Sequence, residues 1–306
     1  MSSAEEVTAG LDLSGMTAVV TGCNSGLGYE TMRILAMRGA HVLGTARTEE
    51  KGEKACSEID GKATPVVLEL SDFDSVAACA KAIKAMDLPI DMLICNAGIM
   101  ALPELQLVYG LERQFVVNHL GHFLLTNLLI DNVKRAEQGR IVNVSSCAHE
   151  FAPEKGIEFD NLDGSKGYSG WPAYGQSKLA NCLFTAELAR RLDGSGVTAN
   201  TLHPGVIKTN LARHLDENPD DVDDSVFDKS IPQGAATQCY VATNPALSSV
   251  SGHYFVDCNP ATANDFMYDA ALAQQLWSVS EKLTGGYLDR AWSLSHIHVR
   301  RDIGSS

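Results

Sequence analysis

Tyr174 and Lys178, in the stretch YGQSK, are spaced for proton transfer. Four residues on a helix make about one turn, so the two side chains share a face and can approach each other. A free tyrosine has a pKa of about 10 and is a poor acid or base at neutral pH. An ammonium about 5 Å away, at an effective dielectric of about 20, contributes roughly 3 kcal/mol and is expected to lower that pKa by about two units. The pair therefore predicts a general acid–base tyrosine, and the alternative is a chance pairing on a surface helix.

Two further polar positions could complete such a site. Ser145 and Ser146 end the apolar stretch RIVNV, where a hydroxyl would project toward a ligand and hydrogen-bond a substrate carbonyl. Asn118 lies in an otherwise apolar segment, FVVNHLGHFLL. Because a buried amide needs partners, Asn118 is either part of the site or a structural asparagine whose hydrogen bonds the protein satisfies.

The stretch TGCNSGLG, residues 21–28, predicts a phosphate-binding turn. Glycines between an apolar strand and a helix let the backbone approach a pyrophosphate, and the helix N-terminus supplies N–H donors. Gly22, Gly26 and Gly28 meet that requirement, although their spacing is GxxxGxG rather than the GxGxxG of the general dinucleotide fingerprint. The alternative is a tight turn that needs its glycines only for packing.

The end of the second predicted strand decides the choice of dinucleotide. An acidic residue there would hydrogen-bond the ribose of NAD and repel the 2′-phosphate of NADP. Here the strand ends with Ala46 and Arg47, and a guanidinium can pair with phosphate, so the sequence favours NADP(H) unless Arg47 is a solvated surface residue. Glu69, at the end of the third predicted strand, is placed either to meet the adenine ring or to lie in water.

The elements that must position these residues alternate between strand and helix. Apolar runs predict strands near residues 16–20, 41–47, 64–70, 91–98, 140–146, 197–205 and 252–257, and helices near 29–40, 74–86, 110–136, 171–192 and 265–285. Strands that are apolar throughout are typical of a parallel sheet with helices on both faces. The sequence therefore predicts an α/β fold, a single Rossmann-type doubly wound domain with a seven-stranded parallel sheet, whose ligand site lies at the carboxyl ends of the strands.

We expect three parts in the chain: an N-terminal extension at residues 1–12, an NADP(H)-binding and catalytic domain at 13–285, and a C-terminal tail at 286–306. Two long loops, about residues 147–173 and 205–233, flank the predicted site and are expected to act as lids. The second loop carries the acidic run DENPDDVDDSVFD, which would disfavour anionic substrates unless it lies in solvent away from the pocket.

Composition excludes several classes of function. A net charge of −14 over 306 residues disfavours binding to nucleic acid. The start MSSAEEVTAG does not resemble a signal peptide and no apolar run has the length of a membrane span, so we expect a cytoplasmic protein without an integral membrane segment. The eight cysteines show no CxxC or Cys/His ligand spacing, which argues against a metal site and against a disulfide framework.

Taken together, these motifs make the chain resemble the short-chain dehydrogenase/reductase family. TGCNSGLG resembles the cofactor turn of that family, CNAG its Asn-Ala-Gly motif, VNHLGHFLL its helix asparagine, NVSS its catalytic serine, YGQSK its YxxxK motif and HPG its nicotinamide-side turn. The sequences of the stretches NVSSCAHEF, AYGQSKLANCLF and HPGVIKTNL are most similar to the branch of the retinol dehydrogenases and WW-domain-containing oxidoreductases. The chain shows neither the N-terminal membrane helix nor the WW module of that branch, which points to a soluble carbonyl reductase.

The resemblance implies a role for each residue of the site. Tyr174 would exchange a proton with the substrate oxygen, Lys178 would lower its pKa and hold the nicotinamide ribose, and Ser146 would polarise the carbonyl. Asn118 would anchor a water that relays protons to Lys178. The cofactor would be NADP(H), with NAD(H) less favoured, bound by Gly22, Asn24, Ser25, Gly26, Leu27, Gly28, Arg47, Glu69, Leu70, Asn96, Ala97, Gly98, Tyr174, Lys178, Pro204, Gly205, Val206 and Thr209.

The predicted function is therefore the NADP(H)-dependent interconversion of a neutral, fairly apolar carbonyl, a ketone or an aldehyde, and its alcohol. Two alternatives are an NAD-dependent alcohol dehydrogenase and a non-catalytic NADP(H)-binding sensor or scaffold. The intact tyrosine, lysine, serine and asparagine argue against the sensor, which has no need of a proton relay. The resemblance also implies a homodimer or homotetramer, because the family commonly pairs subunits through the helices that carry Asn118 and Tyr174.

Overall fold

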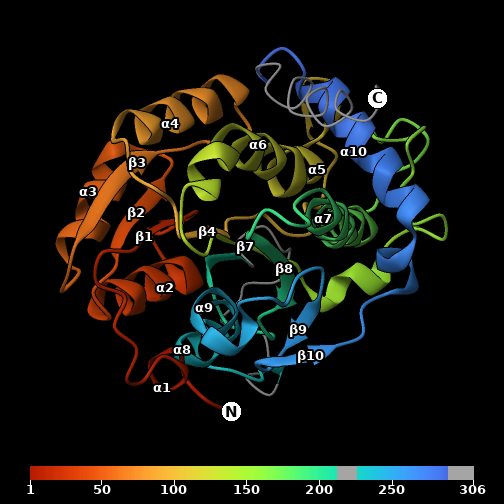
Figure 1. Ribbon diagram of the computed structural model, residues 1–306. Helices are drawn as coiled ribbons and strands as arrows, with labels where there is room; N and C mark the ends of the chain where they lie inside the picture. Colours follow the sequence, from red (N-terminus) through yellow and green to blue (C-terminus); the bar gives the residue numbers. More distant parts are fainter. Residues whose placement is uncertain (212–225, 289–306) are drawn as a thin grey trace, which may run out of the picture.

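A central sheet of eight strands organises the computed structural model, which describes residues 1–211 and 226–288 (Figure 1). The order across the sheet is β10-β9-β8-β7-β4-β1-β2-β3. The strands are β1 (Thr17–Val20), β2 (His41–Ala46), β3 (Ala63–Val67), β4 (Met92–Cys95), β7 (Arg140–Val144), β8 (Thr198–His203), β9 (Tyr254–Val256) and β10 (Asn259–Ala261). The first seven in this list are parallel, which confirms the predicted doubly wound α/β fold.

The prediction of seven strands is wrong by one, because β10 adds an antiparallel edge strand next to β9. A two-residue turn joins them, and its residues, Asp257 and Cys258, both have left-handed backbone conformations (φ 52° and 61°). Such a turn matches the twist of a tight hairpin. The sequence signal was weak because β10 is only three residues long and contains a proline.

Helices cover both faces of the sheet (Figure 1). On one face lie α4 (Phe73–Ala85), α6 (Gly121–Lys134), α7 (Gly170–Arg191) and α10 (Ala270–Thr284); on the other lie α2 (Gly26–Met37), α3 (Glu49–Ser57) and α9 (Ala236–Thr243). Side chains alternate along each strand, so Val19 and Leu93 join the first core while Val20 and Ile94 join the second. The sheet is thus buried on both sides, as its continuous apolar strands predict.

The single long helix predicted near residues 110–136 is wrong in its first part. Tyr109 and Gly110 have left-handed φ values of 54° and 74°, and they form the turn of a small hairpin, β5 (Leu107–Val108) and β6 (Leu111–Glu112). The helix begins only after Glu112, whose carboxylate accepts hydrogen bonds from the N–H groups of Gln114 and Phe115. It then runs as α5 (Arg113–Phe115), the π-helix η1 (Val116–Leu120) and α6.

Several shorter elements complete the fold. The predicted extension holds α1 (Ala4–Val7), which packs against α8 (Ile231–Gly234) and α9 and buries Ala4 and Thr8. The 3₁₀ helices include η2 (Cys147–Phe151), η5 (Pro245–Leu247) and η6 (Asp265–Tyr268). Because η6 occupies residues 265–268, the last predicted helix begins at Ala270 rather than near Asp265. Most of the predicted acidic run and of the tail lies outside the described residues.

The described residues also bear on two other classes of site. No helix within residues 1–211 and 226–288 is both long and apolar enough to cross a membrane. The same part of the chain contains no group of three or more His, Cys, Asp or Glu side chains placed to hold a metal ion. All eight cysteines are free thiols.

Candidate active site

A cleft of about 600 Å³ opens at the carboxyl ends of β1, β2, β3 and β4. This is the edge where a doubly wound sheet binds its ligand, and the volume suits a small molecule or cofactor. Most of the predicted cofactor residues line it: Gly22, Asn24, Ser25, Gly26, Leu27, Arg47, Glu69, Leu70, Asn96, Ala97, Gly98 and Thr209.

The glycine turn is shaped for close approach of a ligand to the backbone. Gly22 and Gly26 have left-handed φ values of 76° and 59°, which side chains rarely adopt. A Cβ atom at Gly28 would collide with the carbonyl oxygen of Gly22, so this glycine packs the turn rather than lining the cleft. Ser25 precedes α2 without a side-chain capping bond, which leaves first-turn N–H groups to face an anion.

Three cationic side chains line the same cleft. Arg47 follows β2, Lys51 lies one turn further along in α3, and Arg113 opens α5. With the glycine turn, this donor set fits a ligand that carries several phosphate charges. Sequence reasoning found Arg47 but missed Lys51 and Arg113. Lys51 could have been found from its spacing of four residues after Arg47, whereas nothing in the sequence places Arg113 beside the cleft.

Thr21 ties the glycine turn to the Asn-Ala-Gly motif and to the helix of Asn118. Its Oγ1 accepts hydrogen bonds from the N–H groups of Asn96 and Ala97, both at 2.9 Å, and lies 2.9 Å from Nε2 of His122. Since two donors already occupy the oxygen, its hydroxyl proton is directed at Nε2, and Nδ1 of His122 donates to the carbonyl of Asn118 at 3.0 Å. Burial lowers the pKa of His122 to about 4, so the ring is neutral at neutral pH.

Both polar atoms of the Asn118 side chain are hydrogen-bonded to other residues of the protein. Its Oδ1 accepts from the N–H of Ile99 and its Nδ2 donates to the carbonyl of Ile99, both at 2.9 Å. Nδ2 also donates to Oγ of Ser177 at 2.9 Å, and that hydroxyl donates to the carbonyl of Tyr174 at 2.7 Å. The amide therefore joins the loop after β4 to the helix that carries Tyr174, as expected of a structural asparagine whose hydrogen bonds the protein satisfies. Its role in a proton relay stays a prediction.

Tyr174 and Lys178 lie on one face of α7, as their spacing predicts. Nζ of Lys178 is 5.7 Å from the centre of the Tyr174 ring and donates a hydrogen bond to the carbonyl of Val144 at 3.0 Å. Nζ of Lys178 also adjoins the cleft at Gly98, which is one of the lining residues. If Gly98 carried a Cβ atom, that atom would lie 3.6 Å from Nζ. Both side chains are buried.

The predicted lowering of the tyrosine pKa is wrong for this structure. Burial raises the pKa of Tyr174 above its usual value, a hydrogen bond with Ser146 opposes that shift, and Lys178 is not among the causes. Burial also lowers the pKa of Lys178 to about 8. The two-unit prediction took only the attraction between the charges and left out the cost of ionising a phenol away from water. Tyr174 is therefore held as a protonated donor at neutral pH.

The two adjacent serines have different surroundings. Ser145 is buried, and its Oγ donates to the carbonyl of Lys178 at 2.8 Å. Ser146 is half-buried, and its hydroxyl both interacts with Tyr174 and accepts from the N–H of Ala148 at 3.2 Å. Of the two, Ser146 thus has its hydroxyl beside the phenol and near solvent, and its catalytic role stays a prediction.

The turn at Pro204, Gly205 and Val206 does not line the cleft, although Thr209 beyond it does. Gly205 has φ 109° and packs against the side chain of Lys229, whose Nζ donates to the carbonyl of Pro204 at 2.9 Å. The N–H of Val206 donates to Oδ1 of Asp228 at 2.7 Å. These bonds tie the two ends of the second predicted lid together at its base.

Comparison with known proteins agrees with this geometry. The sequence matches the family profile described as short chain dehydrogenase over residues 16–220. The chain belongs to the short-chain dehydrogenase family. Members of this family are NAD(P)-dependent oxidoreductases that act on CH–OH and C=O groups, so this short-chain dehydrogenase is an enzyme of that class.

Two named relatives and one solved structure are similar to this short-chain dehydrogenase over nearly its whole length. It is 43% identical over 296 residues to "Short-chain dehydrogenase TIC 32 B, chloroplastic" of Brassica napus, covering 92% of each chain. It is 43% identical over 303 residues to retinol dehydrogenase 11 of Homo sapiens, covering 94% of this chain and 92% of the other. A crystal structure of an uncharacterized protein from Mycobacterium paratuberculosis superposes with a TM-score of 0.75 at 36% identity, covering 91% and 97% of the two chains. The resemblance to the retinol dehydrogenase branch is thereby confirmed.

The serine pair gives a direct test of the catalytic arrangement in this short-chain dehydrogenase. Ser146→Ala is expected to lower kcat about 10²-fold, because it removes a hydroxyl that would hold the substrate oxygen. Ser145→Ala is expected to leave kcat within a few-fold and to cost about 1 kcal/mol of stability through its lost hydrogen bond to Lys178. Steady-state kinetics and thermal melts of both variants separate the two effects. Equal losses of kcat, or a loss from Ser145→Ala alone, would show that the wrong serine was assigned.

Proposed function

We propose that the protein is an NADP(H)-dependent oxidoreductase that interconverts a neutral, fairly apolar ketone or aldehyde and its alcohol, with Tyr174 as general acid and base. One observation carries the proposal. A buried tyrosine that keeps its proton lies beside the Ser146 hydroxyl and one helical turn from Lys178, and the Lys178 ammonium adjoins the cleft at Gly98. The three side chains have the functions that carbonyl reduction needs: a proton donor, a group to hold the oxygen and a cation.

The reaction follows from these positions. When bound, NADP(H) would supply the hydride that the carbonyl carbon accepts in reduction. Tyr174 gives its phenolic proton to the carbonyl oxygen, so that hydride and proton together make the alcohol, and it takes the proton back in oxidation. Ser146 hydrogen-bonds the same oxygen and polarises the C=O bond. Lys178 would offer its ammonium to the ribose of the bound cofactor.

The preference for NADP(H) rests on the charge at the end of β2. Arg47 and Lys51 both line the cleft there, and the strand ends in Ala46 without a carboxylate that would repel a 2′-phosphate. The phosphate at this position would carry nearly two negative charges, so two cations favour it over a ribose hydroxyl.

Arg47→Asp tests this preference. The variant is expected to raise KM for NADPH about 10²-fold and to leave KM for NADH unchanged or lowered, because the new carboxylate repels the phosphate and can accept from the ribose. Lys54→Asp makes the same charge change on an exposed position of α3 that does not line the cleft, and should behave as the wild type. A wild type that already prefers NADH would contradict the assignment of the cofactor.

Aromatic side chains beside the tyrosine support an apolar substrate. The ring of Trp171 meets the ring of Tyr174 edge to face at 6.1 Å, and Phe151 meets Trp171 at 6.4 Å. Both outer rings are exposed, Phe151 by 59% and Trp171 by 45%, so together they offer an exposed apolar surface beside Tyr174. Such rings favour a carbonyl compound with hydrocarbon next to the reacting carbon over a small charged one.

The proposed function is tested by following NADPH oxidation with a panel of aromatic, aliphatic and terpenoid ketones and aldehydes. Stoichiometric formation of alcohol is expected with neutral, apolar members of the panel. Faster turnover of alcohols with NAD⁺ would instead identify an NAD-dependent alcohol dehydrogenase. NADPH binding without turnover of any carbonyl would favour the sensor or scaffold.

We also propose a cytoplasmic location. The eight free thiols support a reducing compartment, in which disulfides rarely persist. A Brassica napus relative is described as chloroplastic, and a plastid stroma would satisfy the same chemistry. Microscopy of the tagged full-length protein distinguishes the two compartments.

A further inference from the structure

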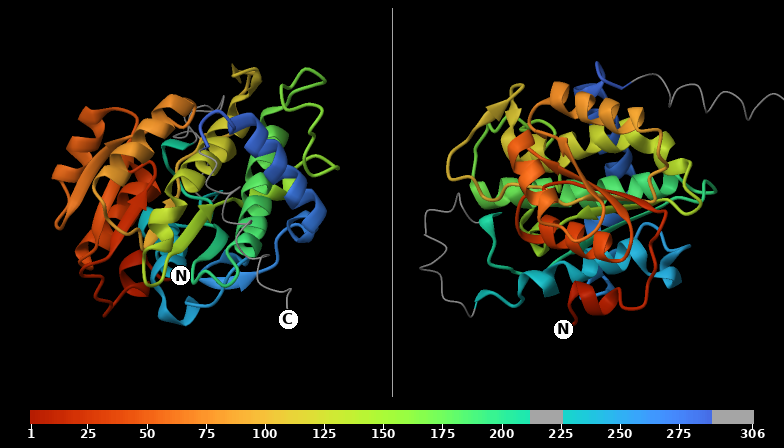
Figure 2. Two further views of the ribbon diagram at one scale, coloured as in Figure 1. Left: turned by 45° about the horizontal axis from the view of Figure 1, so that its top comes forward. Right: turned by 90° about the vertical axis from the view of Figure 1, so that its left-hand side faces the viewer.

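The C-terminal helix α10 is amphipathic, and its apolar face is fully covered. Ala273, Leu276, Trp277, Ser280 and Thr284 are buried, and their spacing of three or four residues places them on one face. The opposite face, which includes Gln274, Gln275 and Ser278, is exposed. Figures 1 and 2 show α10 lying alongside α7, the helix that carries Tyr174, and the two helices pack together.

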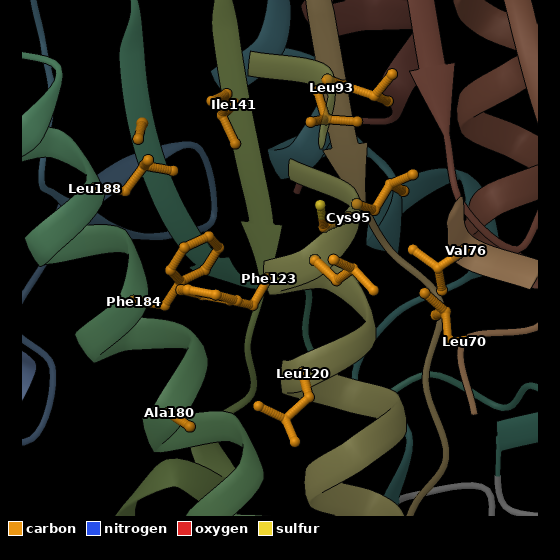
Figure 3. Packing of buried hydrophobic residues seen from close by; sticks show 14 of the residues in the cluster. Leu70, Val76, Leu93, Cys95, Leu120, Phe123, Ile141, Ala180, Phe184 and Leu188 are labelled. Carbon is orange, nitrogen blue, oxygen red and sulfur yellow. The ribbon is translucent and has the colours of Figure 1, made fainter. Parts of the chain in front are cut away.

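Trp277 is the centre of this contact. Its ring meets Phe123 of α6 edge to face at 5.0 Å and lies 5.7 Å from the ring of Phe184 of α7. Phe123 and Phe184 pack on each other at 5.3 Å, as the close-up of the core shows (Figure 3). The guanidinium of Arg191 lies 4.1 Å from the centre of the Trp277 ring. One buried indole thus closes an aromatic cluster to which α6, α7 and α10 all contribute.

A polar contact extends the packing to the π-helix η1. Nε2 of His119 lies 2.8 Å from Oγ of Ser280 on α10, and both groups are buried. Burial lowers the pKa of His119 to about 3, so the ring stays neutral at the pH of the cell. Because His119 follows Asn118 directly, α10 also supports the segment that holds the site asparagine.

This packing leaves no exposed residue in the middle of the two helices concerned. Every residue of α7 from 174 to 185 is buried, and every residue from 116 to 127 in η1 and α6 is buried as well. In a helix that lines an open subunit interface, one stripe of side chains would be exposed in the single chain. The sheet, α4 and α10 between them cover these helices inside one chain. The surface needed for the expected pairing of subunits through the helices of Asn118 and Tyr174 is therefore already occupied.

We propose that α10 takes the place of a second subunit, sealing the face of α6 and α7 within the chain so that the enzyme is a monomer. A stable dimer needs roughly 800 Å² of complementary surface on each partner, and residues 116–127 and 174–185, which are all buried, leave none along the middle of these helices. The catalytic helix is then supported by a contact that does not depend on protein concentration. This inference concerns assembly and does not rest on the proposed reaction.

The first test is the mass of the full chain in solution. Light scattering after size exclusion should give 32.8 kDa at all concentrations from about 1 to 100 μM, whether or not NADPH is added. A mass of twice or four times that value would overturn the proposal. Hydrogen exchange of the wild type gives a second, independent measure: protection of the amides of residues 174–185 should be the same at both ends of the range. Protection that rises with concentration would mean that a partner covers α7, and would also overturn it.

The second test weakens the seal. Trp277→Ala should increase hydrogen exchange in α7 several-fold and make the chain self-associate, because Phe123 and Phe184 lose their cover. Gln275→Ala, on the exposed face of the same helix, should remain a monomer with wild-type exchange. If the tryptophan variant does not fold, the mass and the hydrogen exchange of the wild type still decide whether the enzyme is a monomer. A folded variant that stays monomeric with unchanged exchange would show that α10 is not the seal.

Discussion

Replacing Tyr174 by phenylalanine is expected to lower kcat for carbonyl reduction by about 10³-fold and to leave the Kd for NADPH within about twofold. In the proposed reaction the phenol gives its proton to the substrate oxygen, and general acid catalysis contributes about 10² to 10⁴ in rate. Burial raises the pKa of Tyr174, so the wild-type phenol is fully protonated at neutral pH and its loss is not masked by partial ionisation. The substitution removes one oxygen from a buried ring and keeps its packing against Trp171.

The measurement combines NADPH oxidation with fluorescence titration of NADPH binding. Tyr240→Phe is a matched control, because Tyr240 lies on α9 at the opposite face of the sheet, away from the cleft. It should keep wild-type kcat and wild-type Kd. Residual activity of Tyr174→Phe above one-tenth of the wild type would contradict the assignment of the acid. A loss of NADPH binding together with activity would mean that the ring positions the cofactor instead.

The fold could be predicted because its signals are local. Continuous apolar strands, glycines at the end of the first strand and a helix after each turn determine a doubly wound sheet with little help from tertiary contacts. The same holds for Ser146, Tyr174 and Lys178, because the end of a strand and one turn of a helix fix where they point. Arg47 was found for the same reason, as the residue that directly follows β2.

Other features depend on contacts between distant parts of the chain. Arg113 lines the cleft because α5 packs beside it, and that packing has no signal in the sequence. The hairpin before α5 needs two residues with left-handed backbone conformations, Tyr109 and Gly110. Of these, only the glycine signals such a conformation in the sequence. The pKa of Tyr174 was predicted with the wrong sign because burial, which outweighs one nearby charge, is a property of the assembled core.

Replacing Lys178 is expected to lower the activity of the enzyme strongly without lowering its stability. Lys178→Met should lower kcat by about 10² to 10³-fold, since the ammonium that would hold the ribose of the cofactor in the proposed reaction is lost. The same variant should unfold at an equal or higher temperature than the wild type at pH 7. Burial lowers the pKa of Lys178 to about 8 from a usual value of 10.5, which means that folding a charged lysine at this position costs roughly 3 kcal/mol.

The pH dependence of this lysine provides the deciding measurement. Between about pH 8 and 10.5 the unfolded chain binds the proton of Lys178 and the folded chain does not, so its contribution makes the wild type more stable as pH rises through that window. Activity should change in the opposite sense, with kcat/KM for reduction falling above about pH 8 as the ammonium is lost. Lys178→Arg keeps the charge and should move this fall to higher pH even if its kcat is reduced, because a guanidinium does not lose its proton there. A fall that stays near pH 8 in Lys178→Arg would assign the titration to another group and remove Lys178 from its proposed role.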